Sequence, residues 1–404
     1  MATAAGTAGV VSLSAQAPQF LLESLAGAAE PARPGEKILV VVQLTGGNDG
    51  LNTVVPFRDD RYLSARPSLA LGKSAVLKLD TDTGLHPNLK GLAKLFEDRQ
   101  LSILQGVGYP NPNRSHFESM DIWHTARVKE GTRDLGWLGN AFDLQQTRLS
   151  QSADPVAIHL GAEVQPLALA ARDLPSPSIR SLDYFRLDTG NNPEQRTAIQ
   201  TATSAPRDSA SSLLKFVQTR TTSALEVSQR LEHSAEAYKS SVKYPATPLA
   251  GKLRNIAQLI DVGLATRVYY VSLEGFDTHS DQAASHAGLM LQLGDALAAF
   301  QDDLNQHSQQ DRVLTLVFSE FGRRVRENAS RGTDHGAAAP VFLLGNKVRP
   351  GLLGKHPSLS DLDDGDLKFQ TDFRSIYATL LENWLGWPAT AVLGETFSPE
   401  NILA

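Results

Sequence analysis

The 404-residue chain contains no cysteine. This absence excludes disulfide bonds, thiolate zinc sites, iron–sulfur clusters and cysteine nucleophiles. Any metal in this protein must therefore be held by histidine, aspartate, glutamate and other oxygen ligands. Histidine is also scarce, with 10 in the whole chain, so each histidine that stands near an acidic residue is a candidate ligand.

The chain also lacks an excess of positive charge and a long hydrophobic run. Its 38 basic and 44 acidic residues give a net charge of −6, whereas proteins that grip polyphosphate backbones are normally basic. No stretch reaches the roughly 18 consecutive apolar residues of a membrane span. Hydrophobic residues still make up 41% of the chain, which excludes global disorder. We expect a globular protein without a membrane span that does not bind nucleic acid by bulk charge.

Residues 1–36 have the composition of a segment separate from the fold. Residues 3–28 are small, Ala-rich and nearly uncharged, like the apolar and cleavage regions of an export signal. Residues 15–17 and 26–28 both read Ala-x-Ala, as cleavage sites do. The basic part of a twin-arginine-type signal does not precede them in this chain. We expect either an export-signal remnant or a flexible N-terminal tail, joined to the fold by residues 29–36.

Apolar strand patterns alternate with helical patterns through the remainder of the chain. Continuous apolar runs predict buried strands at 37–44, 101–107, 155–160, 267–273, 312–318 and 340–344. Helical spacing predicts helices at 86–98, 115–126, 208–241, 247–264, 286–307 and 372–385. This alternation predicts an α/β fold with a mostly parallel central sheet and helices on both faces. We expect a single domain over 37–404 with a helical insertion at about 180–264.

Polar, acid-rich clusters directly follow four of the predicted strands. They contain Asp49 after the first strand, Ser115 in the turn after the second, Asp277 and His279 after the fourth, and Glu320 after the fifth. Open α/β sheets bind ligands at the carboxyl ends of their strands, so these residues are expected to converge. Carboxylates and imidazoles suit a hard or borderline metal. A serine at the start of a helix suits a nucleophile, because the positive helix end stabilises an alkoxide.

Each of these residues also has a purely structural interpretation. Asp49 beside two glycines could form a turn, and Ser115 could cap a helix with Glu118 completing a capping box. The basic cluster Arg323, Arg324 and Arg326 is either a solvated helix start or a clamp on an anionic group. The acidic residues at 361–366 lack the spacing of a calcium loop, which favours a solvated loop.

Five stretches of the sequence are distinctive: residues 43–53 (QLTGGNDGLNT), 113–123 (NRSHFESMDIW), 274–279 (EGFDTH), 319–324 (SEFGRR) and 332–336 (GTDHG). Together they resemble the signatures of a large, sulfatase-like bacterial family of unknown function that usually carries a twin-arginine export leader. The resemblance covers essentially all of residues 37–390. That family in turn resembles a branch of the alkaline phosphatase superfamily, which includes sulfatases and phosphodiesterases. The resemblance implies an alkaline phosphatase-like fold and a periplasmic or secreted protein.

The resemblance further implies a metal-dependent hydrolase that acts on an anionic phosphate or sulfate ester. By this resemblance, Asp49 and Ser115 would hold one metal, and Asp277, His279 and His335 would hold the other. Ser115 would attack the phosphorus or sulfur, and Arg323 or Arg114 would bind a non-bridging oxygen. Zinc is the first candidate metal, with manganese or calcium as the alternatives. No particular oligomeric state is indicated.

The chain departs from the superfamily pattern after the strand at 312–318. In one alignment, Asp334 and His335 supply the usual Asp-His pair of metal ligands. In the other, Glu320 replaces that Asp, Phe321 replaces its His, and His335 is the last ligand. The second alignment respects the strand order but removes one ligand from a two-metal site. A sulfatase is one alternative to a phosphate-ester hydrolase, because sulfate and phosphate esters share tetrahedral geometry. A non-catalytic binding or assembly protein on the same fold is the other alternative, and the departure at Glu320 and Phe321 favours it.

Overall fold

The computed structural model describes residues 36–129, 131, 133–149, 154–174, 176–180 and 238–404. The expected N-terminal tail lies outside these residues except for its last residue. The helix expected at 208–241 also lies outside them except for its last four positions, and so does most of the insertion expected at about 180–264. All six predicted strands fall within the described part of the chain.

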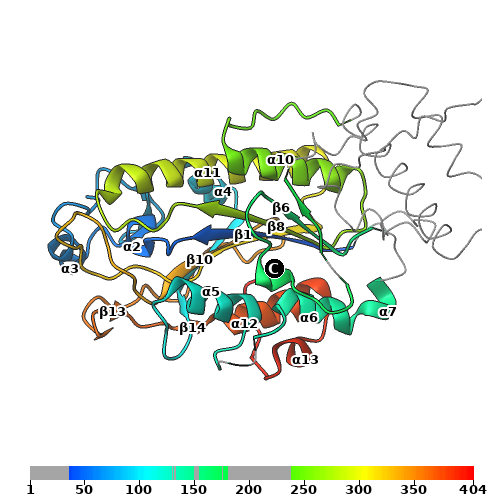
Figure 1. The fold of residues 1–404 in the computed structure, drawn as a ribbon. Helices are drawn as coiled ribbons and strands as arrows, with labels where there is room; N and C mark the ends of the chain where they lie inside the picture. The colour runs from blue at the N-terminus through cyan, green and yellow to red at the C-terminus, as the bar shows by residue number, and fades with distance from the viewer. Residues whose placement is uncertain (1–35, 130, 132, 150–153, 175, 181–237) are drawn as a thin grey trace, which may run out of the picture.

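A nine-stranded sheet runs through the centre of the molecule (Figure 1). Its strand order is β11-β5-β10-β9-β1-β8-β6-β7, with β14 paired to the side of β5. The strands are β1 (Ile38–Thr45), β5 (Leu101–Gly108), β6 (Ala157–Leu160), β7 (Ser178–Ile179), β8 (Val268–Glu274), β9 (Val313–Ser319), β10 (Ala339–Leu344), β11 (Gly351–Leu353) and β14 (Thr371–Asp372). Only β10 runs antiparallel to its neighbours, so the expected mostly parallel α/β sheet is confirmed.

Helices cover both faces of this sheet, as the strand–helix alternation predicts (Figure 1). One face carries α4 (Lys90–Glu97), α10 (Pro248–Asp261) and α11 (Gln282–Gln306). The other carries α5 (His116–Thr125), α6 (Trp137–Leu144), α12 (Phe373–Thr379) and α13 (Ala389–Leu393). Shorter turns are α2 (Gly50–Thr53), α3 (Asp60–Ala65), α7 (Gln146–Leu149) and η1 (Leu167–Leu169). The helix expected at 372–385 is instead split between α12 and a π-helical turn, η3 (Leu380–Leu385). Among the described residues, no helix combines the length and apolar character needed to cross a membrane.

Two small sheets lie outside the central one. Strands β2 (Val54–Val55), β4 (Gly84–Leu85) and β3 (Leu77–Lys78) form a three-stranded antiparallel sheet. Strands β12 (Leu362–Asp363) and β13 (Asp366–Leu367) form a hairpin. Its two turn residues, Asp364 and Gly365, have φ values of 50° and 84°. This Asp-Gly pair suits a tight hairpin turn because aspartate and glycine tolerate the left-handed conformation.

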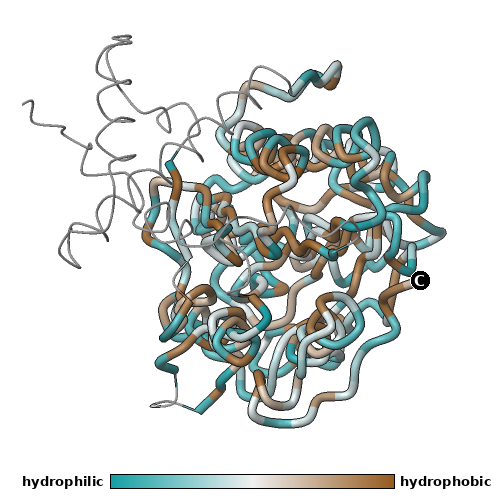
Figure 2. Tube along the Cα trace, turned by 90° about the vertical axis from the view of Figure 1, so that its right-hand side faces the viewer, coloured by the Kyte–Doolittle hydropathy of each residue, from teal (hydrophilic) through white to brown (hydrophobic). Residues whose placement is uncertain are grey.

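The hydrophobic core is divided into two layers by the sheet. Along β1, Val40 and Val42 pack with the layer beneath α4, α10 and α11, while Leu39 and Val41 pack with the opposite layer. Successive side chains of a strand point to opposite faces, so one strand contributes to both layers. The hydropathy colouring shows hydrophobic stretches along the central strands and facing helices, with mainly hydrophilic outer loops (Figure 2). This double burial explains why β1 is an uninterrupted apolar run.

The central strands also bring the polar loops together. Strand β1 pairs in parallel with β8, where Thr45 lies beside Glu274, and with β9, where Leu44 lies beside Ser319. The three strands therefore end at the same edge of the sheet. The loops that follow them carry the residues identified from the sequence.

A close helix crossing on one face gives a test of the packing. A Cβ atom on Gly91 of α4 would lie 2.2 Å from the carbonyl oxygen of Gly294 on α11, whereas Gly288 on the same α11 has nothing within 4 Å. Gly91→Ala should lower the free energy of unfolding by about 1–3 kcal/mol, because the helices must move apart. Gly288→Ala should raise it by about 0.5–1 kcal/mol, because alanine loses less backbone entropy. Urea denaturation of both variants measures the difference, and equal effects would contradict the close crossing.

Candidate metal centre

Side chains from three separate loops meet beyond the carboxyl ends of β8 and β9. His116 begins α5, Asp277 and His279 follow β8, and His335 lies between β9 and β10. Ligand atoms of His116, Asp277 and His335 all lie within 4.8 Å of one another. Asp277 Oδ1 lies 3.4 Å from His116 Nε2, 3.0 Å from His279 Nε2 and 3.1 Å from His335 Nε2. The structure therefore places three imidazole nitrogens around one carboxylate oxygen, and we call the four residues His116, Asp277, His279 and His335 the ring.

The second nitrogen of each of these imidazoles faces a hydrogen-bond acceptor. The pairs are His116 Nδ1 with Glu320 Oε1 (3.0 Å), His279 Nδ1 with Asp334 Oδ1 (3.2 Å), and His335 Nδ1 with the Arg114 carbonyl oxygen (2.7 Å). An ionised carboxylate or a carbonyl only accepts, so each Nδ1 carries the proton. In the neutral imidazole, Nε2 then presents a lone pair. Carboxylate and carbonyl partners of this kind orient metal-binding histidines in proteins.

These lone pairs face one another, and this arrangement fits a cation. His279 Nε2 and His335 Nε2 are 2.9 Å apart, and the buried Nε2 of His116 has no hydrogen-bond partner. Acceptors crowded in this way repel one another unless a positive charge lies among them. Tetrahedral zinc with bonds of roughly 2.1 Å separates its ligand atoms by about 3.4 Å. The residues present therefore fit a divalent metal held by nitrogen and oxygen.

The centre is open to solvent on one side. The exposed fraction of the side chains rises from 22% for His335 to 43% for His279 and 49% for Asp277. Catalytic metal sites keep such an open position, whereas structural sites are closed by protein ligands. The arrangement therefore leaves room for a small ligand beside Asp277.

Neighbouring groups set the pKa values of the cluster. Burial alone would raise the pKa of Asp277, but the hydrogen bond and the positive charge of Arg323 bring it well below its ordinary value. The hydrogen bond to Glu320 raises the pKa of His116, while burial lowers the pKa of His335. Asp277 is therefore ionised at neutral pH and available as an anionic ligand.

The Arg323 side chain, predicted to bind a substrate oxygen, lies behind Asp277 and is 0% exposed. It donates to Asp277 Oδ1 at 2.8 Å and to the carbonyl oxygens of Gly46, Gly47, Phe276 and Thr333. These carbonyls belong to the loops after β1, after β8 and before β10. The guanidinium thus joins the three loops and orients the Asp277 carboxylate, which gives Arg323 a positioning role.

The two alignments offer Glu320 and Asp334 as alternative metal ligands. In the structure, each of these carboxylates contacts the Nδ1 atom of a histidine of the ring and is not itself a member of the ring. Glu320 is 1% exposed and accepts from the Gly46 N–H at 2.8 Å as well as facing His116. Asp334 accepts from Asn328 at 3.0 Å as well as facing His279. Each carboxylate therefore orients a histidine.

His116 is the member of the ring that sequence reasoning missed. It directly follows the candidate nucleophile Ser115 in the NRSHFES stretch. The chain has only 10 histidines in 404 residues, so a histidine next to the candidate nucleophile is unusual. This adjacency to Ser115 was the feature of the sequence that could have identified His116 as a ligand.

Ser115 is an exposed residue at the N-cap of α5, next to the ring. Its side chain makes no capping hydrogen bond, and Glu118 is engaged by Arg133 at 2.6 Å, so the capping box does not form. The residue lies between Arg114, whose carbonyl faces His335, and His116. The Ser115 hydroxyl is therefore not used for capping, and Ser115 directly precedes His116 of the candidate metal centre along the chain.

Asp49 lies apart from the ring, in a buried polar network. Its carboxylate is 0% exposed and lies 2.5 Å from the Arg66 guanidinium, which is also 0% exposed. Gln282 donates to the same oxygen at 2.5 Å. Burial would raise the pKa of Asp49, but the Arg66 charge brings it below its ordinary value. Among the described residues, the geometry thus gathers one group of metal-ligating side chains, and Asp49 already has a cation of its own.

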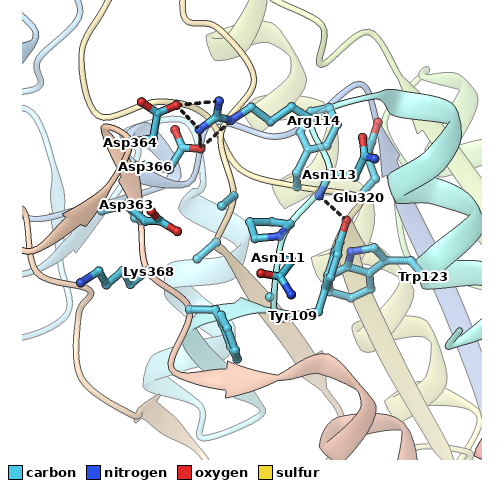
Figure 3. A pocket seen from close by; sticks show the side chains of 17 residues that line it. Tyr109, Asn111, Asn113, Arg114, Trp123, Glu320, Asp363, Asp364, Asp366 and Lys368 are labelled. Carbon is cyan, nitrogen blue, oxygen red and sulfur yellow. Dashed lines mark hydrogen bonds and ion pairs between the residues drawn. The ribbon is translucent and has the colours of Figure 1, made fainter. Parts of the chain in front are cut away.

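The structure contains a cavity of about 680 Å³, whose lining side chains are drawn in Figure 3. It shares Arg114, Glu320 and Phe321 with the surroundings of the centre, and the Phe321 ring lies 5.0 Å from that of His116. Its other polar walls are formed by Asn111, Asn113, Asp363, Asp364, Asp366 and Lys368. The cavity can therefore receive the remainder of a ligand whose reactive group is at the centre.

Comparison with known proteins identifies the family. The family described as "Protein of unknown function (DUF1501)" matches residues 100–385. The chain belongs to this family, which confirms the family of unknown function expected from the motifs. No curated protein matches the chain significantly.

Solved structures with a similar chain arrangement include three from bacteria. The C-terminal periplasmic domain of EcEptC from Escherichia coli, in complex with Zn, has a TM-score of 0.37 and 11% identity, covering 79% of this chain and 77% of that one. A protein in the alkaline phosphatase superfamily from Vibrio parahaemolyticus has a TM-score of 0.41 and 10% identity, covering 93% and 77%. The PsFucS1 sulfatase from Pseudoalteromonas sp. has a TM-score of 0.40 and 11% identity, covering 89% and 68%. Likenesses this distant do not extend to substrates or to individual residues.

The Asp49–Arg66 pair gives a test of the buried network. Arg66→Met should lower the free energy of unfolding by about 3–5 kcal/mol, because it leaves the Asp49 carboxylate buried without its counter-charge. Adding Asp49→Asn should restore most of that loss, because neither charge then remains buried alone. Denaturant unfolding of the two single variants and the double variant measures the coupling. A stable Arg66→Met protein would show that Asp49 does not depend on this arginine.

Proposed function

We propose that this member of the DUF1501 family is an exported, metal-dependent hydrolase of phosphate esters. One observation supports the proposal most strongly. Three imidazole nitrogens lie 3.0–3.4 Å from one carboxylate oxygen of Asp277, and the Asp277 side chain is partly exposed to solvent. An accessible cluster of imidazole nitrogens and a carboxylate suits a divalent cation, and a cation near a serine hydroxyl that makes no capping bond supports hydrolytic chemistry.

His116, Asp277 and His335, with His279 beside them, would hold the metal. Their mixture of imidazole nitrogen and carboxylate oxygen favours zinc, with manganese as an alternative, while calcium prefers oxygen ligands alone. A divalent ion bound there supplies Lewis acidity toward an ester oxygen and lowers the pKa of a nearby hydroxyl.

Ser115 is the residue we assign as nucleophile. It is exposed at the N-terminus of the 10-residue helix α5, and its hydroxyl makes no capping hydrogen bond. The positive end of the helix and its free N–H groups favour an alkoxide and an incoming oxyanion. In this role, Ser115 Oγ would attack the phosphorus as the bond from phosphorus to the ester oxygen breaks, and the alcohol would leave toward the cavity with the serine proton. A water molecule would then cleave the phosphoserine ester, which releases the phosphate and returns a proton to Ser115 Oγ.

The neighbouring residues prepare this site without reacting. Arg323 keeps the Asp277 carboxylate ionised and oriented, and Glu320 and Asp334 hold two imidazoles in the required tautomer. The cavity beside Phe321 would hold the alcohol part of the ester and exclude water from it.

A sulfatase is the nearest alternative, because sulfate and phosphate esters share tetrahedral geometry around the reacting atom. A non-catalytic binding protein is the alternative from a different class. The buried ion pair of Asp49 with Arg66 and the full engagement of Arg323 favour it, since neither group is free to contact a substrate. These alternatives predict different outcomes for metal content and turnover.

Metal content is the first measurement. Elemental mass spectrometry of the purified protein should find about one equivalent of zinc or manganese per chain. Asp277→Ala and His335→Ala should each lose it, while Ser115→Ala should retain it because the serine is not among the clustered ligands. A folded wild-type protein that takes up no added zinc, manganese or calcium would contradict the metal site.

Turnover then separates the enzyme from the binding protein. Matched 4-nitrophenyl phosphate, bis(4-nitrophenyl) phosphate and 4-nitrophenyl sulfate compare the two ester types on one leaving group. Ser115→Ala should lower kcat by roughly a thousandfold or more while leaving metal content unchanged, because the nucleophile is lost and the ligands remain. Metal-loaded protein that hydrolyses none of these esters would favour the binding protein, and activity on the sulfate ester alone would favour the sulfatase.

A further inference from the structure

Two arginines beside the metal centre share an exposed carboxylate. Asp364 Oδ2 lies 3.1 Å from both Nη1 and Nη2 of Arg114 and 3.3 Å from Nη2 of Arg324. The Asp364 side chain nevertheless remains 75% exposed. One solvent-facing oxygen thus accepts from two guanidinium groups, which is the pattern by which proteins bind phosphate or sulfate oxygens.

The neighbouring Asp366 differs from Asp364 in burial. Its side chain is 2% exposed, and its Oδ2 lies 2.8 Å from Arg114 Nε and 2.6 Å from Arg114 Nη2. Asp366 is therefore a fixed partner that balances one of the two arginine charges. When Asp364 turns away into solvent, two guanidiniums and one carboxylate remain, and the net charge of the group becomes +1.

The hairpin turn allows Asp364 to leave without moving the backbone. Asp364 is the first of the two turn residues between β12 and β13, with φ of 50°. Its side chain points from the tip toward Arg114 (Figure 3). Rotation about the side-chain bonds alone releases it, and ion pairs at exposed positions are weak enough to exchange readily.

The two arginines are anchored at the metal centre by their main chains. The Arg114 carbonyl faces His335 Nδ1 at 2.7 Å, and the Arg324 N–H donates to the Asp334 carbonyl oxygen at 3.0 Å. Arg114 and Asp364 also line the cavity beside the centre. An anion bound between the arginines would therefore lie along the wall of that cavity.

We propose that Arg114 and Arg324 form an oxyanion subsite and that Asp364 occupies it as a tethered carboxylate until a ligand displaces it. The ligand is a tetrahedral oxyanion: either a second phosphate or sulfate group of the substrate or the inorganic anion that the reaction releases. Only the origin of that anion rests on the proposed function. The subsite itself follows from the two guanidiniums and the exposed carboxylate.

Direct binding tests the subsite without any catalysis. Inorganic phosphate is titrated by calorimetry into chelator-treated protein, so that a metal plays no part. Asp364→Asn keeps a residue that tolerates the left-handed turn and removes its charge. It should tighten phosphate binding by about two- to fivefold, the amount expected when a competing exposed ion pair is removed. Arg114→Gln/Arg324→Gln, combined with Asp364→Asn, should abolish that binding.

Asp363→Asn is the matched control for general charge. Asp363 is exposed on the same hairpin and lines the same cavity, and it differs from Asp364 in having no hydrogen bond to Arg114 or Arg324 among those that the structure shows. It should change phosphate affinity by less than about twofold. Equal effects of Asp363→Asn and Asp364→Asn, or no effect of Asp364→Asn, would overturn the proposal.

The metal-loaded protein then distinguishes the two origins of the anion. If the anion belongs to the substrate, Asp364→Asn should lower KM for 4-nitrocatechol phosphorylated on both oxygens but not for the singly phosphorylated compound. If it is the released anion, the same variant should instead show stronger inhibition by phosphate. A protein that binds phosphate as expected but hydrolyses no ester would retain the subsite and contradict the proposed function, so the two can fail separately.

Discussion

The buried guanidinium of Arg323 is the interaction on which the arrangement of the site depends. Its donors reach carbonyl groups in the loops after β1 and β8 and in the loop before β10. Without this donor, the buried carbonyl oxygens that it contacts in the three loops would need other hydrogen-bond partners or water. A charged donor at the point where they meet satisfies several acceptors and orients the Asp277 carboxylate. The candidate metal centre is therefore built around the positive charge of an arginine.

A second buried arginine shows how similar sequence positions acquire different roles. Asp49 and Asp277 both follow a buried strand at the same edge of the sheet. Arg66 neutralises Asp49 inside the protein, whereas Asp277 is half exposed and faces three imidazoles. Burial with a fixed counter-charge makes the first carboxylate structural. Exposure beside unprotonated nitrogens makes the second one available to a metal and to solvent.

The sequence predicted much of the fold and part of the site. The strands were recognisable because buried parallel strands are continuous apolar runs, and six of them lie where expected. The end of the chain was harder, because the amphipathic pattern at 372–385 keeps helical spacing throughout and does not reveal where α12 gives way to the π-helical turn. Among site residues, Asp277, His279 and His335 do converge, since they lie in loops that parallel strands bring to one edge. His116 was not predicted as a ligand, because a histidine at the start of a helix has no periodicity that distinguishes it.

The sequence by itself determined the α/β alternation, the family and the ligand types that a chain without cysteine can offer. These follow from composition and local pattern, which depend on neighbours along the chain. The tertiary structure decided which carboxylates are neutralised, which nitrogens of the histidines face one another, and which arginines are enclosed. Glu320 and Asp334 accept hydrogen bonds from His116 and His279 and are not members of the ring. Arg323 connects three loops through its hydrogen bonds and contacts Asp277. Such roles depend on distances of a few ångströms between residues hundreds of positions apart, and no local pattern specifies those distances.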